Sequence, residues 1–137
     1  MAYEHLIGRP FLKSAKELVH HREGQGTRHV FINQRNIPTT SLYQIVRDVE
    51  NATEDITSHV GMHAHNCPST FLFIGKGHDL RGLICEVTLG DERYMLESPA
   101  SVFIPGGVLH SYRFIGGSGY FVNTLLSPDY NSSIVTP

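Results

Sequence analysis

Two histidines one residue apart, His63 and His65, occur in the segment GMHAHNCPSTFLFIGKG. In an extended strand such residues point to the same face and lie about 7 Å apart along the chain. Imidazole is the commonest side-chain metal ligand and the usual proton carrier near neutral pH. If this face points inward, both rings need water, hydrogen-bond partners or a metal ion, because an unsatisfied buried polar group costs free energy.

A third histidine follows a turn-forming run farther along the chain. His110 ends the run PGGVLH, in which proline and two glycines favour a tight turn before a strand. Together with GMHAHNCPSTFLFIGKG, this run resembles the two signatures of the cupin family, which are HxH followed by an acid and a glycine, and then PxGxxH. The resemblance covers roughly residues 40–125.

Cupins are double-stranded jelly-roll barrels, in which antiparallel sheets enclose a cavity. The resemblance implies that residues 1–137 form a single all-β domain of this type, with a short helix or arm at the amino end. It also implies that His63, His65 and His110 bind one divalent metal ion. Three neutral imidazoles suit Fe(II), which we favour, as well as Zn, Ni, Cu, Co or Mn, and they leave coordination positions open for a substrate.

The sequence departs from the cupin pattern at two positions. Thr70 stands where the family usually has a glutamate ligand, and Phe114 stands where it usually has an asparagine. A threonine hydroxyl is not ionised at neutral pH and is a poor metal ligand, so the centre would carry more positive charge than usual. Such a centre favours an anionic substrate that binds through two oxygens, such as a carboxylate or an enolate. We expect Thr70 and Phe114 to contact this substrate.

Strand alternation adds three candidate residues to the same cavity. Tyr112 shares a face with His110, and we therefore expect it to take part in catalysis with the three histidines. Tyr43 and Arg47 share one face of an earlier strand and are expected to bind the substrate. The planar guanidinium of arginine can hold a carboxylate through two parallel hydrogen bonds. The outer face of the sheet is the alternative position for Arg47.

The resemblance leaves the reaction open. Three-histidine cupins include dioxygenases, which favours an Fe(II) enzyme that activates dioxygen, whereas lyase, isomerase or cyclase chemistry needs the same Lewis acid. A cupin that binds or senses a small ligand without turnover is the alternative from a different class. His59 lies on the same face as His63 by alternation and is a fourth ligand, a nearby base or a residue of the cavity rim.

The elements that must position these residues are predicted to be short strands. Runs rich in Val, Ile, Phe, Tyr and Thr are separated by turns that contain Gly, Pro and Asp, a pattern typical of an antiparallel sandwich or barrel. Residues 116–119 are expected to form one of these turns. A short helix or arm is expected within residues 11–22. The polar tail SPDYNSSIVTP is expected to be loosely held or to cross to a neighbouring subunit.

Composition limits the classes of partner. The 137 residues, of which 40% are apolar and 18% charged, suit one soluble domain. The formal net charge of −2 and the lack of a basic cluster argue against a nucleic-acid partner. No apolar run approaches the roughly 20 residues that span a bilayer, and no export signal is evident, so we expect a cytoplasmic protein without a membrane partner. We also expect a small-molecule substrate and a homodimer, because exposed sheet edges often pair with a second copy.

Overall fold

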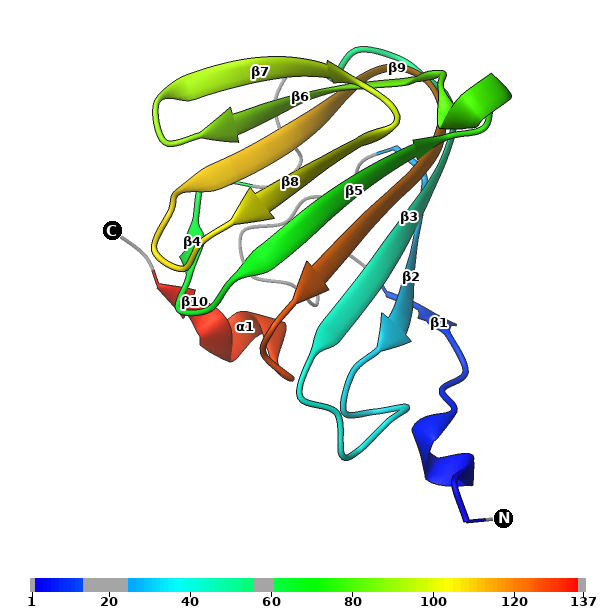
Figure 1. Cartoon of the computed structure of the whole chain (residues 1–137), viewed down its shortest axis with the longest axis vertical. Helices are drawn as coiled ribbons and strands as arrows, with labels where there is room; N and C mark the ends of the chain where they lie inside the picture. Colours follow the sequence, from blue (N-terminus) through cyan, green and yellow to red (C-terminus); the bar gives the residue numbers. More distant parts are fainter. Residues whose placement is uncertain (1, 14–24, 56–60, 136–137) are drawn as a thin grey trace.

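The computed structural model describes residues 2–13, 25–55 and 61–135, and antiparallel strands make up most of this part of the chain (Figure 1). A 3₁₀ helix (η1, Glu4–Leu6) precedes the first strands, a second (η3, His78–Leu80) follows β5, and one short α-helix (α1, Tyr130–Ser133) lies near the end. The strands are β1 (Phe11–Leu12), β2 (Thr27–Ile32), β3 (Tyr43–Ala52), β4 (Ala64–His65), β5 (Ser69–Gly75), β6 (Leu83–Leu89), β7 (Glu92–Glu97), β8 (Ala100–Ile104), β9 (His110–Leu125) and β10 (Ile134–Val135).

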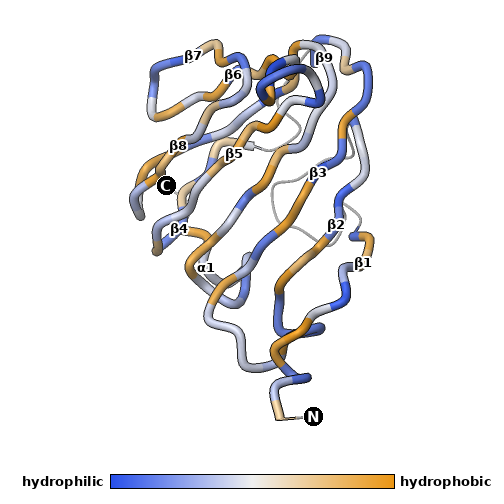
Figure 2. Tube along the Cα trace, turned by 45° about the vertical axis from the view of Figure 1, so that its right-hand side comes forward, coloured by the Kyte–Doolittle hydropathy of each residue, from blue (hydrophilic) through white to orange (hydrophobic). Residues whose placement is uncertain are grey.

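The strands form where aromatic and β-branched residues are concentrated. In β5, Ser69, Phe71 and Phe73 are buried, whereas Thr70 is half-buried and Leu72 is exposed, which is the alternation of a strand with one covered face. Figure 2 shows hydrophobic residues along the strands and hydrophilic residues at many of the connecting turns. The predicted all-β class is therefore confirmed.

All strand pairs are antiparallel, and their order fits a cupin jelly roll. The main sheet has the strand order β1-β2-β3-β9-β5-β8. The first part of β9 pairs with β6, which in turn pairs with β7. The short strand β4 pairs separately with β10. The sheet is strongly curved (Figure 1). Within the described residues, β1, β7 and β8 each pair on one side only, so hydrogen bonding does not close the sheet into a complete barrel.

The turn predicted at residues 116–119 is wrong, because β9 is one strand of 16 residues that continues through these glycines. Its first part pairs with β6 and its second part pairs with both β3 and β5. Gly117 has a φ of +85°, which L residues rarely adopt, and a side chain at Gly119 would meet the carbonyl oxygen of Ile74. The glycines thus let one strand bend and join two parts of the sheet.

Two buried clusters fill the concave side of the sheet. In the larger one, the ring centroid of Phe121 lies 4.1 Å from that of Tyr112 and 4.9 Å from that of Phe71. The smaller cluster consists of Val30, Tyr43, Ile45, Leu125 and Tyr130. The ring of His110 lies 5.8 Å from Phe71, so the histidines rest against the larger cluster. Close packing at this position limits the freedom of the rings.

The structure of the carboxyl end differs from the sequence-based prediction. Tyr130 and Ser133 are 4% and 1% exposed, and β10 pairs with β4 of the same chain through Ile134↔His65 and Val135↔Ala64. In Figure 1, α1 and β10 lie next to β4 at one end of the curved sheet. The prediction for the tail failed because two side chains of this polar segment are buried by tertiary contacts, which composition alone does not reveal.

The amino end agrees with the sequence only in part. The structure has η1 at Glu4–Leu6 and the strand β1 at Phe11–Leu12, whereas residues 14–22 of the predicted helix or arm lie outside the described residues. Among the described residues, no helix has the length and apolar character needed to cross a bilayer.

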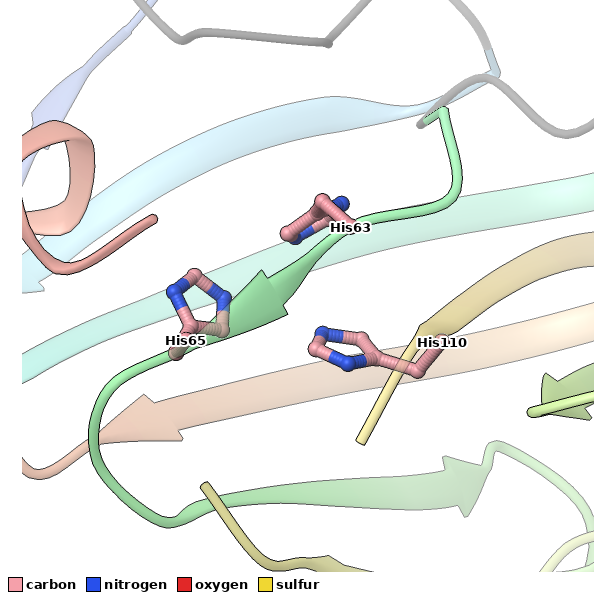
Figure 3. Close-up of side chains that lie close together, drawn as sticks. All are labelled: His63, His65 and His110. Carbon is pink, nitrogen blue, oxygen red and sulfur yellow. The ribbon is translucent and has the colours of Figure 1, made fainter. Parts of the chain in front are cut away.

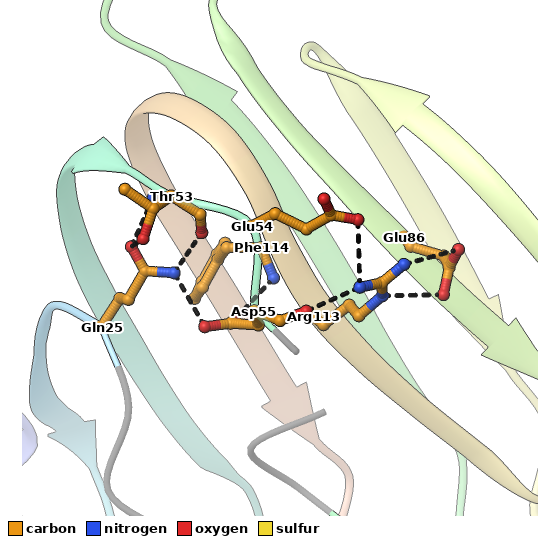
Figure 4. A network of polar contacts seen from close by, with 7 residues as sticks. All are labelled: Gln25, Thr53, Glu54, Asp55, Glu86, Arg113 and Phe114. Carbon is orange, nitrogen blue, oxygen red and sulfur yellow. Dashed lines mark hydrogen bonds and ion pairs between the residues drawn. The ribbon is translucent and has the colours of Figure 1, made fainter. Parts of the chain in front are cut away.

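A polar network fastens the segment after β3 to the sheet (Figure 4). Arg113 on β9 donates to both carboxylate oxygens of Glu86 on β6, over 3.0 and 3.3 Å, and to the carbonyl oxygen of Asp55 over 2.6 Å. The Asp55 carboxylate accepts from the backbone N–H of Phe114 at 2.9 Å and from the Gln25 amide at 2.7 Å. The chain that leads toward His63 is thus anchored just before residues 56–60.

The hydrogen bonds from Arg113 hold the pKa of Glu86 below its ordinary value. A carboxyl group with a lowered pKa in the folded state stabilises the fold above its unfolded pKa, and this contribution is lost as the pH falls through the folded value. We expect Glu86→Gln to lower the free energy of unfolding at neutral pH, and to approach the wild type as the pH falls below about 4.

Urea unfolding at several pH values measures this difference, with Glu97→Gln as the control. Glu97 is more exposed and contacts Arg81 at 3.5 Å, so its substitution should have a smaller effect. Equal stability of Glu86→Gln and wild type at neutral pH would contradict the assigned role of this pair.

Candidate metal centre

The structure brings together the three histidines that the sequence singled out (Figure 3). His63, His65 and His110 are each 2% exposed, and their ring centroids lie 4.6 to 5.3 Å apart. One ring nitrogen from each residue lies within 4.8 Å of the others, so the three residues could hold one metal ion. Two residues of one segment and one residue of a distant strand therefore converge on a single point.

Backbone pairing fixes the positions of all three residues. His63 and His110 face each other in an antiparallel bridge, with N–H···O distances of 2.9 and 3.3 Å. His65 pairs with Ile134 of β10, and its carbonyl oxygen accepts from Gly107 at 2.8 Å. Gly107 has a φ of +85°, which explains the need for glycine in the turn before His110. The ligand backbone is thus held by β9 on one side and β10 on the other.

Hydrogen bonds to carbonyl groups determine which nitrogen of two of the rings carries the hydrogen. Nδ1 of His63 lies 2.6 Å from the Gly61 carbonyl oxygen, and Nδ1 of His110 lies 2.9 Å from that of Val108. A carbonyl oxygen can only accept, so Nδ1 must be the donor in each ring. In the neutral ring, the lone pair is then on Nε2, which is the nitrogen that can bind a metal.

A serine determines the orientation of the third ring. The Ser133 hydroxyl lies 2.6 Å from the Tyr130 carbonyl oxygen, which takes its hydrogen, and 2.9 Å from Nδ1 of His65. Since its only hydrogen is used, Ser133 accepts from Nδ1–H of His65. The lone pair of His65 is therefore also on Nε2. All three rings have the tautomer that histidine ligands adopt when their other nitrogen is held by an oxygen acceptor.

The charge state of the site also fits a metal. Burial lowers the pKa of His110, so the ring is neutral at physiological pH, as a ligand must be. Among the described residues, the cluster contains imidazoles only. A divalent ion bound by His63, His65 and His110 would keep its full positive charge and would have open positions for oxygen ligands.

Thr70 does not face this cluster. It lies on the face of β5 opposite Ser69 and Phe71, paired with Phe103 and Thr124, and Phe103 is 64% exposed. The inward-facing residue at this point is Ser69, one position earlier. The expectation that Thr70 contacts the substrate is corrected by this one-residue difference in alternation. His59, the other residue considered as a ligand, lies outside the described residues.

Tyr130 is a part of the site that sequence reasoning missed. Its hydroxyl lies 2.9 Å from Nε2 of His63, and its ring centroid lies 5.0 Å from that of His65. It belongs to α1, which begins after Asp129, whose side chain accepts from the backbone N–H of Asn131. The only local signal was one aromatic residue that follows a helix-capping aspartate within the polar tail.

A small cavity with room for about one water molecule lies next to the cluster, because Tyr130 both lines the cavity and contacts His63. Its lining includes three of the predicted residues, Tyr43, Arg47 and Tyr112, and the complete lining is Arg28, Tyr43, Ile45, Arg47, Tyr112, Phe121, Asn123 and Tyr130. Phe114 is not part of this lining: it is 0% exposed and packs in the larger core cluster, where its ring centroid lies 5.8 Å from that of Tyr112. Phe114 therefore packs behind the lining, and its contact with a substrate stays a prediction.

The cavity is cationic and incompletely satisfied. Arg47 is 3% exposed, donates through Nε to the Gln25 carbonyl oxygen at 2.5 Å and leaves Nη1 without a hydrogen-bond partner among the described residues. Oδ1 of Asn123 also has no partner there. Burial raises the pKa of Tyr112, and the positive charges of Arg47 and Arg28 oppose that shift. No carboxylate is among the described residues that line the cavity.

Comparison of the sequence with family models and with curated proteins finds no match. The fold does match solved structures. A variant of oxalate decarboxylase from Bacillus subtilis superimposes with a TM-score of 0.58 and 14% identity, over 96% of this chain and 33% of that chain. KdgF from a Halomonas species superimposes with a TM-score of 0.53 and 14% identity, over 80% of this chain and 84% of that chain.

These neighbours are cupins, and the chain has the cupin fold. The resemblance seen in the sequence is confirmed at this level. The chain spans about a third of the length of the oxalate decarboxylase chain. A further structure of that enzyme, which superimposes with a TM-score of 0.57 and 14% identity, comes from work on its Mn(II) centres.

We expect the wild-type protein to hold close to one divalent metal ion per chain, and His63→Ala to hold far less, because the variant loses one of three lone pairs. His78→Ala is the matched control, since its side chain is 94% exposed and lies outside the cluster. Metal analysis of each protein after loading and desalting makes the comparison. Equal and negligible metal in all three samples would contradict a metal centre at this position.

Proposed function

We propose that this chain is a metal-dependent cupin enzyme that acts on a small, anionic substrate through a three-histidine centre. The observation that carries the proposal is the arrangement of His63, His65 and His110, whose Nδ1 atoms all meet oxygen acceptors, so that Nε2 is the metal-binding nitrogen in each ring. A cavity that contains two buried arginines adjoins this centre. A site that combines a cation-binding cluster with arginines suits a substrate whose oxygens chelate a metal and whose charge is negative.

The cavity lining supports a carboxylate as the anionic group. Arg47 has one nitrogen of its guanidinium without a protein partner among the described residues, and a charged donor of this kind binds a carboxylate strongly. Tyr43 and Tyr112 line the same cavity, and we expect their hydroxyl groups to contact the remaining oxygens. The cavity as it stands has room for about one water molecule, so substrate binding requires the lining side chains to move.

Each group has a separate role in the mechanism. The three histidines would hold a divalent ion, which would supply a Lewis acid for substrate oxygens and, as Fe(II), the capacity to activate dioxygen. Arg47 binds and orients the substrate carboxylate. Tyr112, packed against Phe121 and Phe71, limits the access of water and is expected to present its hydroxyl to the substrate. These residues thus contribute by positioning the substrate and by stabilising its charge.

We propose dioxygenase chemistry with Fe(II) as the reaction, because three histidines leave positions for both substrate and dioxygen. Lyase, isomerase or cyclase chemistry is the second candidate, and the likeness of the fold to oxalate decarboxylase favours it. Turnover of small oxo- and enol-carboxylates by the Fe(II)-loaded protein, with and without air, separates the two. A non-catalytic binding protein is the remaining alternative and would hold such ligands without converting them.

The expected homodimer remains part of the proposal. The strands β1, β7 and β8 have unpaired edges within the described structure, and the outer face of the sheet exposes Leu72 and Phe103. Both features are places at which a second copy could pair.

We expect Arg47→Met to weaken the binding of oxalate to the metal-loaded protein by tenfold or more, because a hydrogen bond to a charged group is worth about 1.5–3 kcal/mol. Arg81→Met is the matched control, since its side chain is 67% exposed and outside the cavity. Isothermal titration of oxalate into the loaded proteins measures the effect, and circular dichroism shows that each variant is folded. Unchanged oxalate binding by a folded Arg47→Met protein would contradict the assigned carboxylate site.

A further inference from the structure

The C-terminal segment, defined as residues 127–135, contacts two of the three candidate ligands. Ser133 lies against His65, Tyr130 lies against His63, and β10 pairs with β4. We propose that this segment is part of the metal centre, with Ser133 as the positioning residue of His65 and Tyr130 as a hydrogen-bond donor to the substrate oxygen that binds beside His63. The inference deepens the proposed function and rests on it.

The hydroxyl of Ser133 is a fixed link between the segment and the centre. It donates to the Tyr130 carbonyl oxygen at 2.6 Å and accepts from Nδ1–H of His65 at 2.9 Å. With 1% exposure, water does not replace it readily. Its removal leaves Nδ1–H of His65 without this acceptor and the ring free to turn. Loss of a group that orients a histidine ligand typically lowers metal affinity by about 10- to 100-fold.

The backbone holds the segment where these contacts need it. Ile134 pairs with His65, and the carbonyl oxygen of Ser133 accepts from the backbone N–H of Asn66 at 2.8 Å. The Asp129 side chain accepts from Asn131 N–H and fixes the start of α1. The side chains of Tyr130 and Ser133 are therefore held by regular backbone hydrogen bonds that reach the ligand strand itself.

The contact of Tyr130 with His63 has a direct consequence for ligand binding. Because Nδ1 of His63 donates to the Gly61 carbonyl, Nε2 is the acceptor of the Tyr130 hydroxyl hydrogen, over 2.9 Å. Nε2 has only one lone pair, so a metal and the phenol compete for it. When the metal takes the lone pair, the hydroxyl gives up this acceptor. Tyr130 is 4% exposed, and a substrate oxygen bound next to His63 is the acceptor that replaces the lost one.

The proposed role of Tyr130 predicts different effects of its substitution on metal binding and on anion binding. Tyr130→Phe removes a competitor for the His63 lone pair, so metal binding should not weaken. It also removes a hydrogen-bond donor to a charged substrate oxygen, so anion binding to the loaded protein should weaken by about tenfold. A side chain that only packs against the centre would weaken metal and anion binding together when truncated.

The test measures two dissociation constants for each folded variant. Competition with a chromophoric chelator gives the affinity for Co(II), whose visible spectrum also reports its coordination, and titration with oxalate gives the anion affinity of the Co(II)-loaded protein. Ser132→Ala is the control for Ser133→Ala, because Ser132 is adjacent and exposed. Tyr120→Phe is the control for Tyr130→Phe, because Tyr120 lies on the outer face of β9 and is 38% exposed.

We expect Ser133→Ala to weaken Co(II) binding by about 10- to 100-fold and to alter the Co(II) spectrum, with Ser133→Thr restoring both. If Ser133→Ala does not fold, Ser133→Cys, whose sulfur is a weaker acceptor, should give a smaller loss in the same direction. The Ser132→Ala and Tyr120→Phe proteins should match the wild type in both constants.

Co(II) binding by Ser133→Ala equal to that of Ser132→Ala would overturn the positioning role. Weaker Co(II) binding by Tyr130→Phe, or oxalate binding equal to that of Tyr120→Phe, would overturn the role of Tyr130. A wild-type protein that binds no Co(II) would instead overturn the proposed function, and this inference with it. If the wild-type protein binds Co(II) but the Ser133 and Tyr130 variants do not differ from their controls as predicted, the inference alone has failed.

Discussion

The candidate site depends on one constraint, which is that Nδ1 of each histidine donates to a fixed oxygen. The acceptors are the carbonyl oxygens of Gly61 and Val108 and the hydroxyl of Ser133. Because a neutral imidazole has one hydrogen and one lone pair on its two nitrogens, fixing Nδ1–H leaves every lone pair on Nε2. A metal ion at their common point would bind all three Nε2 lone pairs at once, and at His63 it would replace the hydroxyl of Tyr130. The remainder of the fold holds the three acceptors in place.

The strand β4 shows how the chain meets this constraint. It is only two residues long, yet it contains His65 and directly follows His63. His63 pairs with the start of β9, and β4 pairs with β10, so both ligands are held by backbone pairing. The long β9 is in turn packed against β3, β5 and β6, so His110 is anchored to most of the sheet. The same inner face carries Tyr112 and Asn123 toward the arginine-lined cavity. A cation site and a cationic cavity side by side are consistent with one ligand, an anion that bridges them.

The sequence identifies the residues whose signal is local and misses those whose role is set by tertiary contacts. Alternation places His63 and His65 on one face, and the turn PGGVLH identifies His110. Tyr43, Arg47 and Tyr112 follow from alternation as well.

Thr70 was assigned one residue away from the inward-facing position, since spacing in a motif does not fix the strand register. The glycines at residues 116–119 resemble a turn, although a bent strand has the same need for residues without a side chain. Ser133 carries no local signal and Tyr130 only a weak one, because it is the pairing of β10 with β4 that brings them to the ligands.

X-ray absorption spectroscopy at the metal edge of the Zn(II)-loaded protein tests the central claim most directly, because it reports the atoms bound to the ion itself. The account predicts scattering from three imidazole rings with nitrogen at about 2.0–2.1 Å, together with light-atom ligands in the open positions. Scattering from sulfur, or from one imidazole ring or none, would contradict convergence of His63, His65 and His110 on a single ion.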